Sequence, residues 1–83
     1  MTDLKATIAE LYARLAVPDW ASPNLDGLAD VLRDLSWRPE GEVTLELPDL
    51  RALPMDDAVR LMRVLVTAEV ETADGPRPVR LTA

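Results

Sequence analysis

The chain contains neither cysteine nor histidine, and several kinds of chemistry are therefore closed to it. Disulfides, thiolate nucleophiles and the common zinc sites all need one of these two residue types. Histidine is also the usual general base near neutral pH. These absences argue against an enzyme, and we expect no metal and no cofactor. The lack of cysteine is also compatible with a cytoplasmic location.

Aromatic side chains are scarce as well. They make up 4% of the residues and phenylalanine is absent, although 48% of the chain is apolar. The core is therefore expected to consist mainly of Leu, Val and Ala. With 83 residues, the chain is long enough for one small domain over residues 1–83 and too short for a second core. No apolar run approaches the ~18 residues of a membrane span, and the first residues lack a basic segment followed by an apolar one, so we expect neither a membrane span nor secretion.

Positive charge is in the minority. The sequence has 9 Lys and Arg against 15 Asp and Glu, which gives a formal net charge of −6. An acidic surface repels nucleic acids and anionic membranes, so we expect neither as a direct partner. A basic protein is the natural complement of such a surface.

The first segment has the apolar spacing of an amphipathic helix over residues 3–15. Thr2 is predicted as its N-cap, with Asp3 favourable in the first turn. Pro18 ends the helix, because the residue before a proline avoids helical angles. Residues 19–23 then form a connecting loop. The predicted inward face of this helix consists of Leu4, Ile8, Leu11, Tyr12 and Leu15.

A second helix is predicted over residues 25–35. Either Ser22 or Asn24 could cap it, and the sequence does not decide between them. Asp26 and Asp30 are four residues apart, so they lie one turn above the other. The helix is expected to bury Leu25, Leu28, Leu32 and Leu35 and to expose Asp26, Asp30, Arg33 and Asp34.

The second half of the chain predicts two strands and one helix. Residues 42–47 alternate between apolar and polar side chains, and residues 79–82 form a short terminal strand. A helix is predicted over 56–68, but residues 66–72 also alternate at strand spacing and could form a strand instead. Residues 37–41 form a turn. The helix is expected to direct Ala58, Leu61, Met62, Leu65 and Val66 inward.

The loop and the second helix together form the most informative part of the sequence. A charged pair such as Asp26 and Asp30 is most often a solvated helix face. Trp20 lies between two prolines in a polar loop, which favours partial exposure, whereas Trp37 is expected to pack against the protein. Rigid negative charge beside an exposed aromatic suits docking into a basic cleft that normally holds phosphates.

Residues 15–20 (LAVPDW) and 24–32 (NLDGLADVL) resemble the signature of the barstar family of ribonuclease inhibitors. In that family a proline and an aromatic precede a small loop, an Asn-Leu-Asp-Ala-Leu run and a second Asp one turn later. The strand at 43–47, the helix at 56–68 and the strand at 79–82 follow in the family's order. The resemblance implies an α/β fold with three or four helices on a small, mostly parallel sheet, here without the family's first strand.

The resemblance also implies a function, an antitoxin or immunity protein that plugs the active site of a basic ribonuclease or related toxin. Asp30 would occupy the phosphate pocket, and Asp26 would pair with a neighbouring arginine. Trp20 would stack on a catalytic imidazole, and Asn24 would hold the loop. Ala29 stands where the family has a tryptophan, so less aromatic area is available to anchor a partner.

An alternative function follows from the missing first strand. A sheet of two strands leaves an open edge, and a second copy of the chain could pair with it. The sequence therefore also allows a structural module that forms homo-oligomers.

Overall fold

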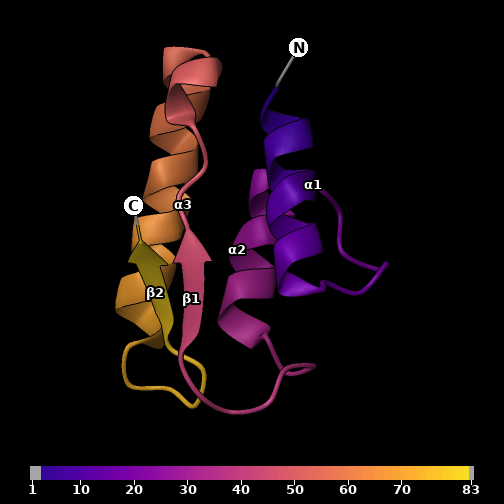
Figure 1. Cartoon of the computed structure of the whole chain (residues 1–83), viewed down its shortest axis with the longest axis vertical. Coiled ribbons are helices and arrows are strands. Elements are labelled where there is room, and N and C mark those ends of the chain that lie inside the picture. Colours follow the sequence, from indigo (N-terminus) through magenta and orange to yellow (C-terminus); the bar gives the residue numbers. More distant parts are fainter. Residues whose placement is uncertain (1–2, 83) are drawn as a thin grey trace.

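The computed structural model describes residues 3–82, which fold into three α-helices, one 3₁₀ turn and two β-strands. Figure 1 shows the two strands side by side along the third helix, with the first two helices on the other side of the molecule. The predicted α/β architecture, with three or four helices on a small, mostly parallel sheet, is confirmed. In chain order the elements are α1 (Leu4–Leu15), α2 (Leu25–Asp34), β1 (Val43–Glu46), η1 (Leu50–Ala52), α3 (Met55–Thr72) and β2 (Val79–Thr82).

The sheet consists of β1 and β2 in parallel, with Val43 opposite Val79 and Glu46 opposite Thr82. Both strands lie within one residue of their predicted positions. Side chains alternate along β1, so that Val43 and Leu45 are buried while Thr44 is exposed. One face of the sheet therefore covers the core, and the other is polar.

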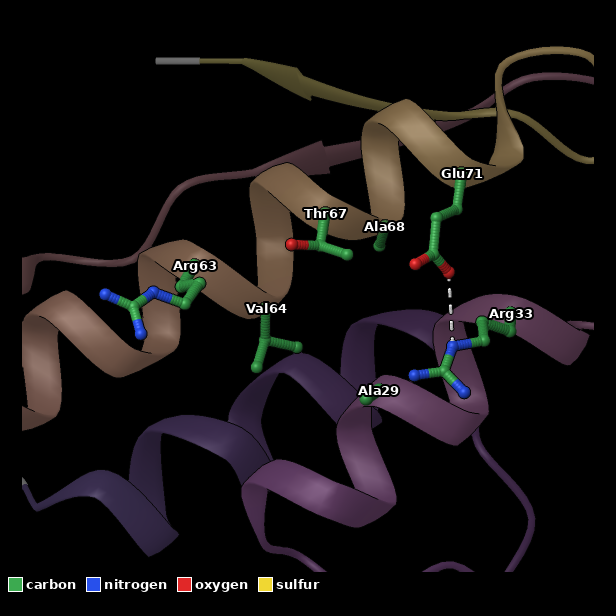
Figure 2. A pocket seen from close by; sticks show the side chains of 7 residues that line it. All are labelled: Ala29, Arg33, Arg63, Val64, Thr67, Ala68 and Glu71. Carbon is green, nitrogen blue, oxygen red and sulfur yellow. Dashed lines mark ion pairs between the residues drawn. The ribbon is translucent and has the colours of Figure 1, made fainter.

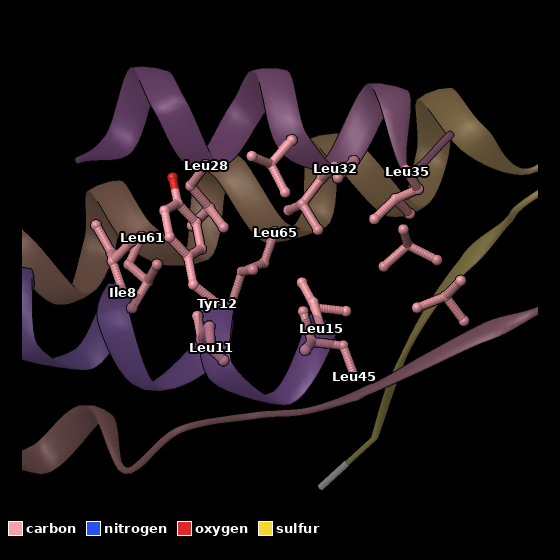
Figure 3. Packing of buried hydrophobic residues seen from close by; sticks show 14 of the residues in the cluster. Ile8, Leu11, Tyr12, Leu15, Leu28, Leu32, Leu35, Leu45, Leu61 and Leu65 are labelled. Atoms are coloured by element: carbon pink, nitrogen blue, oxygen red, sulfur yellow. The ribbon is translucent and has the colours of Figure 1, made fainter. Parts of the chain in front are cut away.

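The core lies between the sheet and the three helices (Figure 3). It is built mainly from leucine, as the composition predicts, and Tyr12 is its aromatic member. Leu4 and Leu25 are only partly buried, whereas Val31 and Thr7, which were not predicted to face inward, are buried. The fully buried large side chains are Ile8, Leu11, Leu28, Leu32, Leu35, Leu45, Leu61, Leu65, Val31 and Val79.

Caps define the first two helices. The side chain of Asp3 accepts the N–H of Ala6 at 2.7 Å, so Asp3 and not Thr2 is the N-cap of α1; Thr2 itself lies outside the described residues. The residues that follow α1 and α2, Ala16 and Leu35, are their C-caps and adopt left-handed conformations with φ of 53° and 48°. The second helix therefore stops one residue before its predicted end at Leu35.

The third helix is longer than predicted. α3 runs from Met55 to Thr72, so the strand interpretation of residues 66–72 was wrong. Leu61 and Leu65 face inward as expected, but Val66 is exposed and Ala68 takes the inward position instead. The buried residues recur at helical spacing from Leu61 to Thr72, and this continuous face keeps the β-branched segment helical.

Candidate partner-binding site

The outer face of α2 carries the two predicted aspartates. Asp26 and Asp30 are both exposed, and the side chain of Asp30 retains 74% of its accessible surface. Leu28, Val31 and Leu32 are buried on the opposite side and hold the helix against the core. The carboxylates are therefore presented to solvent from a firmly packed helix.

One arginine approaches this acidic pair. Arg33 Nη1 lies 3.9 Å from Asp30 Oδ1, while its Nε lies 3.3 Å from Glu71 Oε2 on α3. The shorter contact belongs to Glu71, and all three side chains are largely exposed, where ion pairs contribute little. Asp30 therefore remains available to a partner.

Asn24 is the N-cap of α2, which decides between the two predicted candidates. Its Oδ1 accepts the N–H of Gly27 at 2.7 Å, and its own N–H donates to the carbonyl oxygen of Ser22 at 2.9 Å. Asp26 follows in the first turn, where the positive end of the helix dipole favours a negative charge. The cap thus joins the loop to the acidic helix.

The two tryptophans have different surroundings, as the sequence predicts. Trp20 is 65% exposed, whereas Trp37 is partly buried against the core. Trp37 Nε1 donates to the carbonyl oxygen of Leu15 at 3.2 Å. The rings meet edge to face, with centroids 6.3 Å apart. Trp37 therefore supports Trp20, which remains open to solvent on its other side.

The loop and α2 border an open hollow of about 350 Å³. Trp20 and Ser22 line it from the loop, and Asp26, Gly27 and Asp30 line it from the helix. Four of the five predicted site residues, Trp20, Asn24, Asp26 and Asp30, thus border a single depression with an aromatic wall and an acidic wall.

Comparison with known proteins gives one match. A family model described as "Barstar (barnase inhibitor)" matches residues 1–83, which is the whole chain. The chain belongs to the barstar family. No curated protein and no solved structure matches it. Members of the barstar family inhibit barnase-type ribonucleases and are not enzymes, which supports a protein partner of the ribonuclease kind.

Ala29, the fifth predicted residue, faces a different depression from the other four. It lies at the junction of α2 and α3, in a hollow of about 120 Å³ that Val64 and Ala68 line from α3 (Figure 2). The ion pair between Arg33 and Glu71 closes one side of this hollow. This barstar-family chain therefore has a small indentation between α2 and α3 that Asp30 does not line.

Two residues of the site were not predicted from the sequence. Tyr12 was assigned to the core, but its hydroxyl also reaches the loop at Ser22, and burial together with the charge of Asp30 raises the pKa of its phenol. Gly27 belongs to the barstar-like motif but was not predicted to contribute to the site. Apolar periodicity places a tyrosine in the core but does not show where its hydroxyl points.

Neither a metal-binding cluster nor a membrane-spanning helix is present in the described part of the chain. Residues 3–82 contain no cluster of three or more acidic side chains that could hold a metal ion. Within the same range, no helix combines the length and the apolar character that crossing a membrane requires.

Proposed function

We propose that this barstar-family chain is a cytoplasmic antitoxin or immunity protein that blocks the active site of a basic ribonuclease or related toxin. In this proposal α2 and the loop over residues 18–24 enter the cleft, and the chain acts by occlusion without catalytic residues of its own. The exposed carboxylates of Asp26 and Asp30 beside the exposed indole of Trp20 carry the proposal.

The electrostatics of the surface support this mode of binding. A ribonuclease cleft is basic because it holds RNA phosphates, and two carboxylates on a rigid helix present comparable negative charge. Asp30 has an exposed side chain and only a 3.9 Å contact to Arg33, so it would enter the phosphate pocket with little internal competition. Asp26 would pair with an arginine of the partner beside it.

The hollow between the loop and α2 would supply the non-ionic part of the interface. Trp20 offers one free face to a planar side chain such as a catalytic imidazole, and Trp37 supports it from behind. Large aromatic anchors of this kind often carry much of an interface's binding energy. Asn24 holds the loop through the cap of α2, and Ala29 would contact the partner beside Asp30.

Inhibition of barnase by the Asp30→Asn variant tests the proposal. Removing one carboxylate of a buried interfacial pair is expected to cost about 2–5 kcal/mol of binding free energy. Asp74→Asn is the matched control, because it removes the same charge from the exposed turn after α3. If Asp30→Asn inhibits as strongly as the parent protein, α2 does not act as the plug.

A second candidate function is self-association through β1. In a parallel pair, alternate N–H groups of each strand point away from the partner strand, and the register directs those of Thr44 and Glu46 to the outer edge of β1. A second copy could pair there. Sedimentation over a concentration series tests this candidate, since a protein that stays monomeric at micromolar concentration does not pair through this edge.

A further inference from the structure

A single hydroxyl of the core holds the loop in front of α2. Tyr12 Oη donates to the carbonyl oxygen of Ser22 at 2.6 Å. The tyrosine is only 9% exposed, and Figure 3 shows its ring among core leucines with the oxygen on the side of α2. Because the packing of α1 fixes the ring, the position of the hydroxyl is set by the core and not by the loop.

The same carbonyl group lies against α2 at Gly27. A Cβ added at this position would collide with the Ser22 oxygen and would lie 3.0 Å from Tyr12 Oη. The loop can therefore approach the helix this closely only because residue 27 has no side chain. α1, the loop and α2 meet at this point, through Tyr12, Ser22 and Gly27.

We propose that Tyr12 and Gly27 are positioning residues that fix the spacing between Trp20 and the acidic pair, and thereby set the affinity of the site. Ser22 lies between Trp20 and Asn24, so anchoring its carbonyl group fixes both walls of the hollow relative to each other. Without the anchor, the loop would have to be ordered at the moment of binding, and that entropy would weaken the complex.

The protonation state of Tyr12 agrees with this role. A phenol can hold a carbonyl group only while it keeps its proton, and both burial and the nearby charge of Asp30 favour the protonated form. Asp30, one of the two aspartates that would bind the partner, thus also helps to keep the Tyr12 hydroxyl protonated and able to donate its hydrogen bond. The consequence for binding rests on the proposed function, whereas the conformational role of Tyr12 does not.

Amide exchange in the free protein tests the conformational role. Tyr12→Phe removes only the hydroxyl and is expected to speed exchange of the loop amides Ala21 and Asn24 and of the capped amide Gly27, by about 3- to 10-fold for one lost hydrogen bond. Thr7→Val is the matched control, because it removes a second buried hydroxyl of α1 that bonds Asp3 instead of the loop. Unchanged exchange at these amides in Tyr12→Phe, or the same change in both variants, overturns the proposal.

Gly27→Ala tests the spacing independently. Alanine is favoured over glycine inside a helix by about 1 kcal/mol, so a helix effect alone would stabilise the protein. We expect instead that the methyl group displaces Ser22 and increases acrylamide quenching of Trp20 fluorescence, measured with Trp37 replaced by Phe in both proteins. Quenching equal to that of the Trp37→Phe parent overturns the role of Gly27.

Barnase binding completes the test. We expect Tyr12→Phe to weaken inhibition by about 3- to 10-fold and Thr7→Val to leave it unchanged. If Asp30→Asn abolishes inhibition while Tyr12→Phe has no effect on it, the positioning role is wrong and the proposed function stands. If the parent protein does not bind barnase, both the barnase-type function and the proposed effect of Tyr12 on affinity are wrong. The exchange data then decide whether Tyr12 orders the loop.

Discussion

The side-chain hydroxyl of Thr72 accepts the backbone N–H of Val79 at 2.9 Å and donates its own proton to the carbonyl oxygen of Ala68 at 2.6 Å. Glu69 Oε2 accepts the next outward-facing N–H of β2, that of Leu81, at 2.8 Å. Side chains of α3 thus occupy the free edge of β2. An edge blocked in this way cannot add a further strand, which restricts strand pairing to the outer edge of β1.

Thr72→Val is expected to destabilise the fold. The substitution keeps the shape of the side chain but leaves the buried N–H of Val79 without an acceptor, which costs about 1–3 kcal/mol. Urea unfolding measures the loss as a lower midpoint. Thr67→Val on the exposed side of α3 is the control, and equal midpoints for the two variants would contradict the role of the Thr72 hydroxyl.

We expect substitution of Trp20 to affect mainly binding and substitution of Trp37 to affect mainly stability. Trp20→Ala should leave the unfolding midpoint nearly unchanged, since most of its ring is in solvent, but should weaken ribonuclease inhibition by about 2 kcal/mol or more if the indole is an anchor. Trp37→Ala should lower the midpoint, because it removes packing and the hydrogen bond to Leu15. Urea unfolding and an inhibition assay on the same two variants check both expectations, which fail if Trp20→Ala proves the more destabilising of the two.

Tyr12 is expected to make stability fall in alkali. Its pKa in the folded protein is raised above the ordinary value of 10.0, first by burial and then by the charge of Asp30. The unfolded chain therefore loses this proton first, so the stabilising contribution is complete below pH 10 and is lost as pH rises through the folded pKa.

The ultraviolet absorbance change of phenolate formation can be assigned to Tyr12, because it is the one tyrosine of the sequence. The phenolate signal should appear at higher pH in the folded protein than in urea. Tyr12→Phe should have a flatter stability profile above pH 10. A folded-state titration that coincides with the unfolded one would contradict the burial of this hydroxyl.

Association with the ribonuclease should depend strongly on salt. The net charge of −6 and the exposed acidic pair are expected to speed encounter with a basic protein by about 10- to 1000-fold at low ionic strength. Stopped-flow association rates should therefore fall as salt rises, and the double variant Asp26→Asn, Asp30→Asn should flatten that dependence. A rate independent of salt would contradict electrostatic steering.

Ala16 offers a way to stabilise the protein. This exposed residue adopts φ of 53° at the end of α1, a conformation that costs a residue with a Cβ about 1–2 kcal/mol. Ala16→Gly removes that cost but raises the conformational entropy of the unfolded chain. We therefore expect the free energy of unfolding, measured in urea, to rise by about 0.5–1 kcal/mol. Leu35 has a similar φ but is buried, and Leu35→Gly should instead destabilise the protein.

Much of this fold could be predicted because its signals are local. The 3.6-residue periodicity located α1 and α2, and the clean alternation around Val43 and Leu45 located β1. The end of α3 was missed because Val64, Val66 and Val70 also match strand spacing. Tertiary packing favours the helix over the strand, since Leu65, Ala68 and Thr72 continue its buried face. These packing partners are distant in the sequence and cannot be identified from a short segment.

The candidate site was predicted unevenly for a similar reason. Exposure of Trp20, Asp26 and Asp30 follows from local sequence, and their grouping follows from the barstar-like motif. The contact of Tyr12 with Ser22 joins two elements across ten residues, and no periodicity encodes it. From the sequence alone, position 27 could hold almost any helix-forming residue. Only the neighbouring loop, which lies against Gly27, excludes a side chain there.

The parallel pairing of β1 and β2 also has a kinetic consequence. Parallel strands cannot be joined by a hairpin. β1 and β2 can therefore pair only after the connection that contains η1 and α3 has brought β2 alongside β1. We therefore expect the sheet to assemble late, after the helices have collapsed together. Substitutions at the α3–β2 junction should then accelerate unfolding while leaving the refolding rate almost unchanged, which a chevron plot of Thr72→Val would reveal.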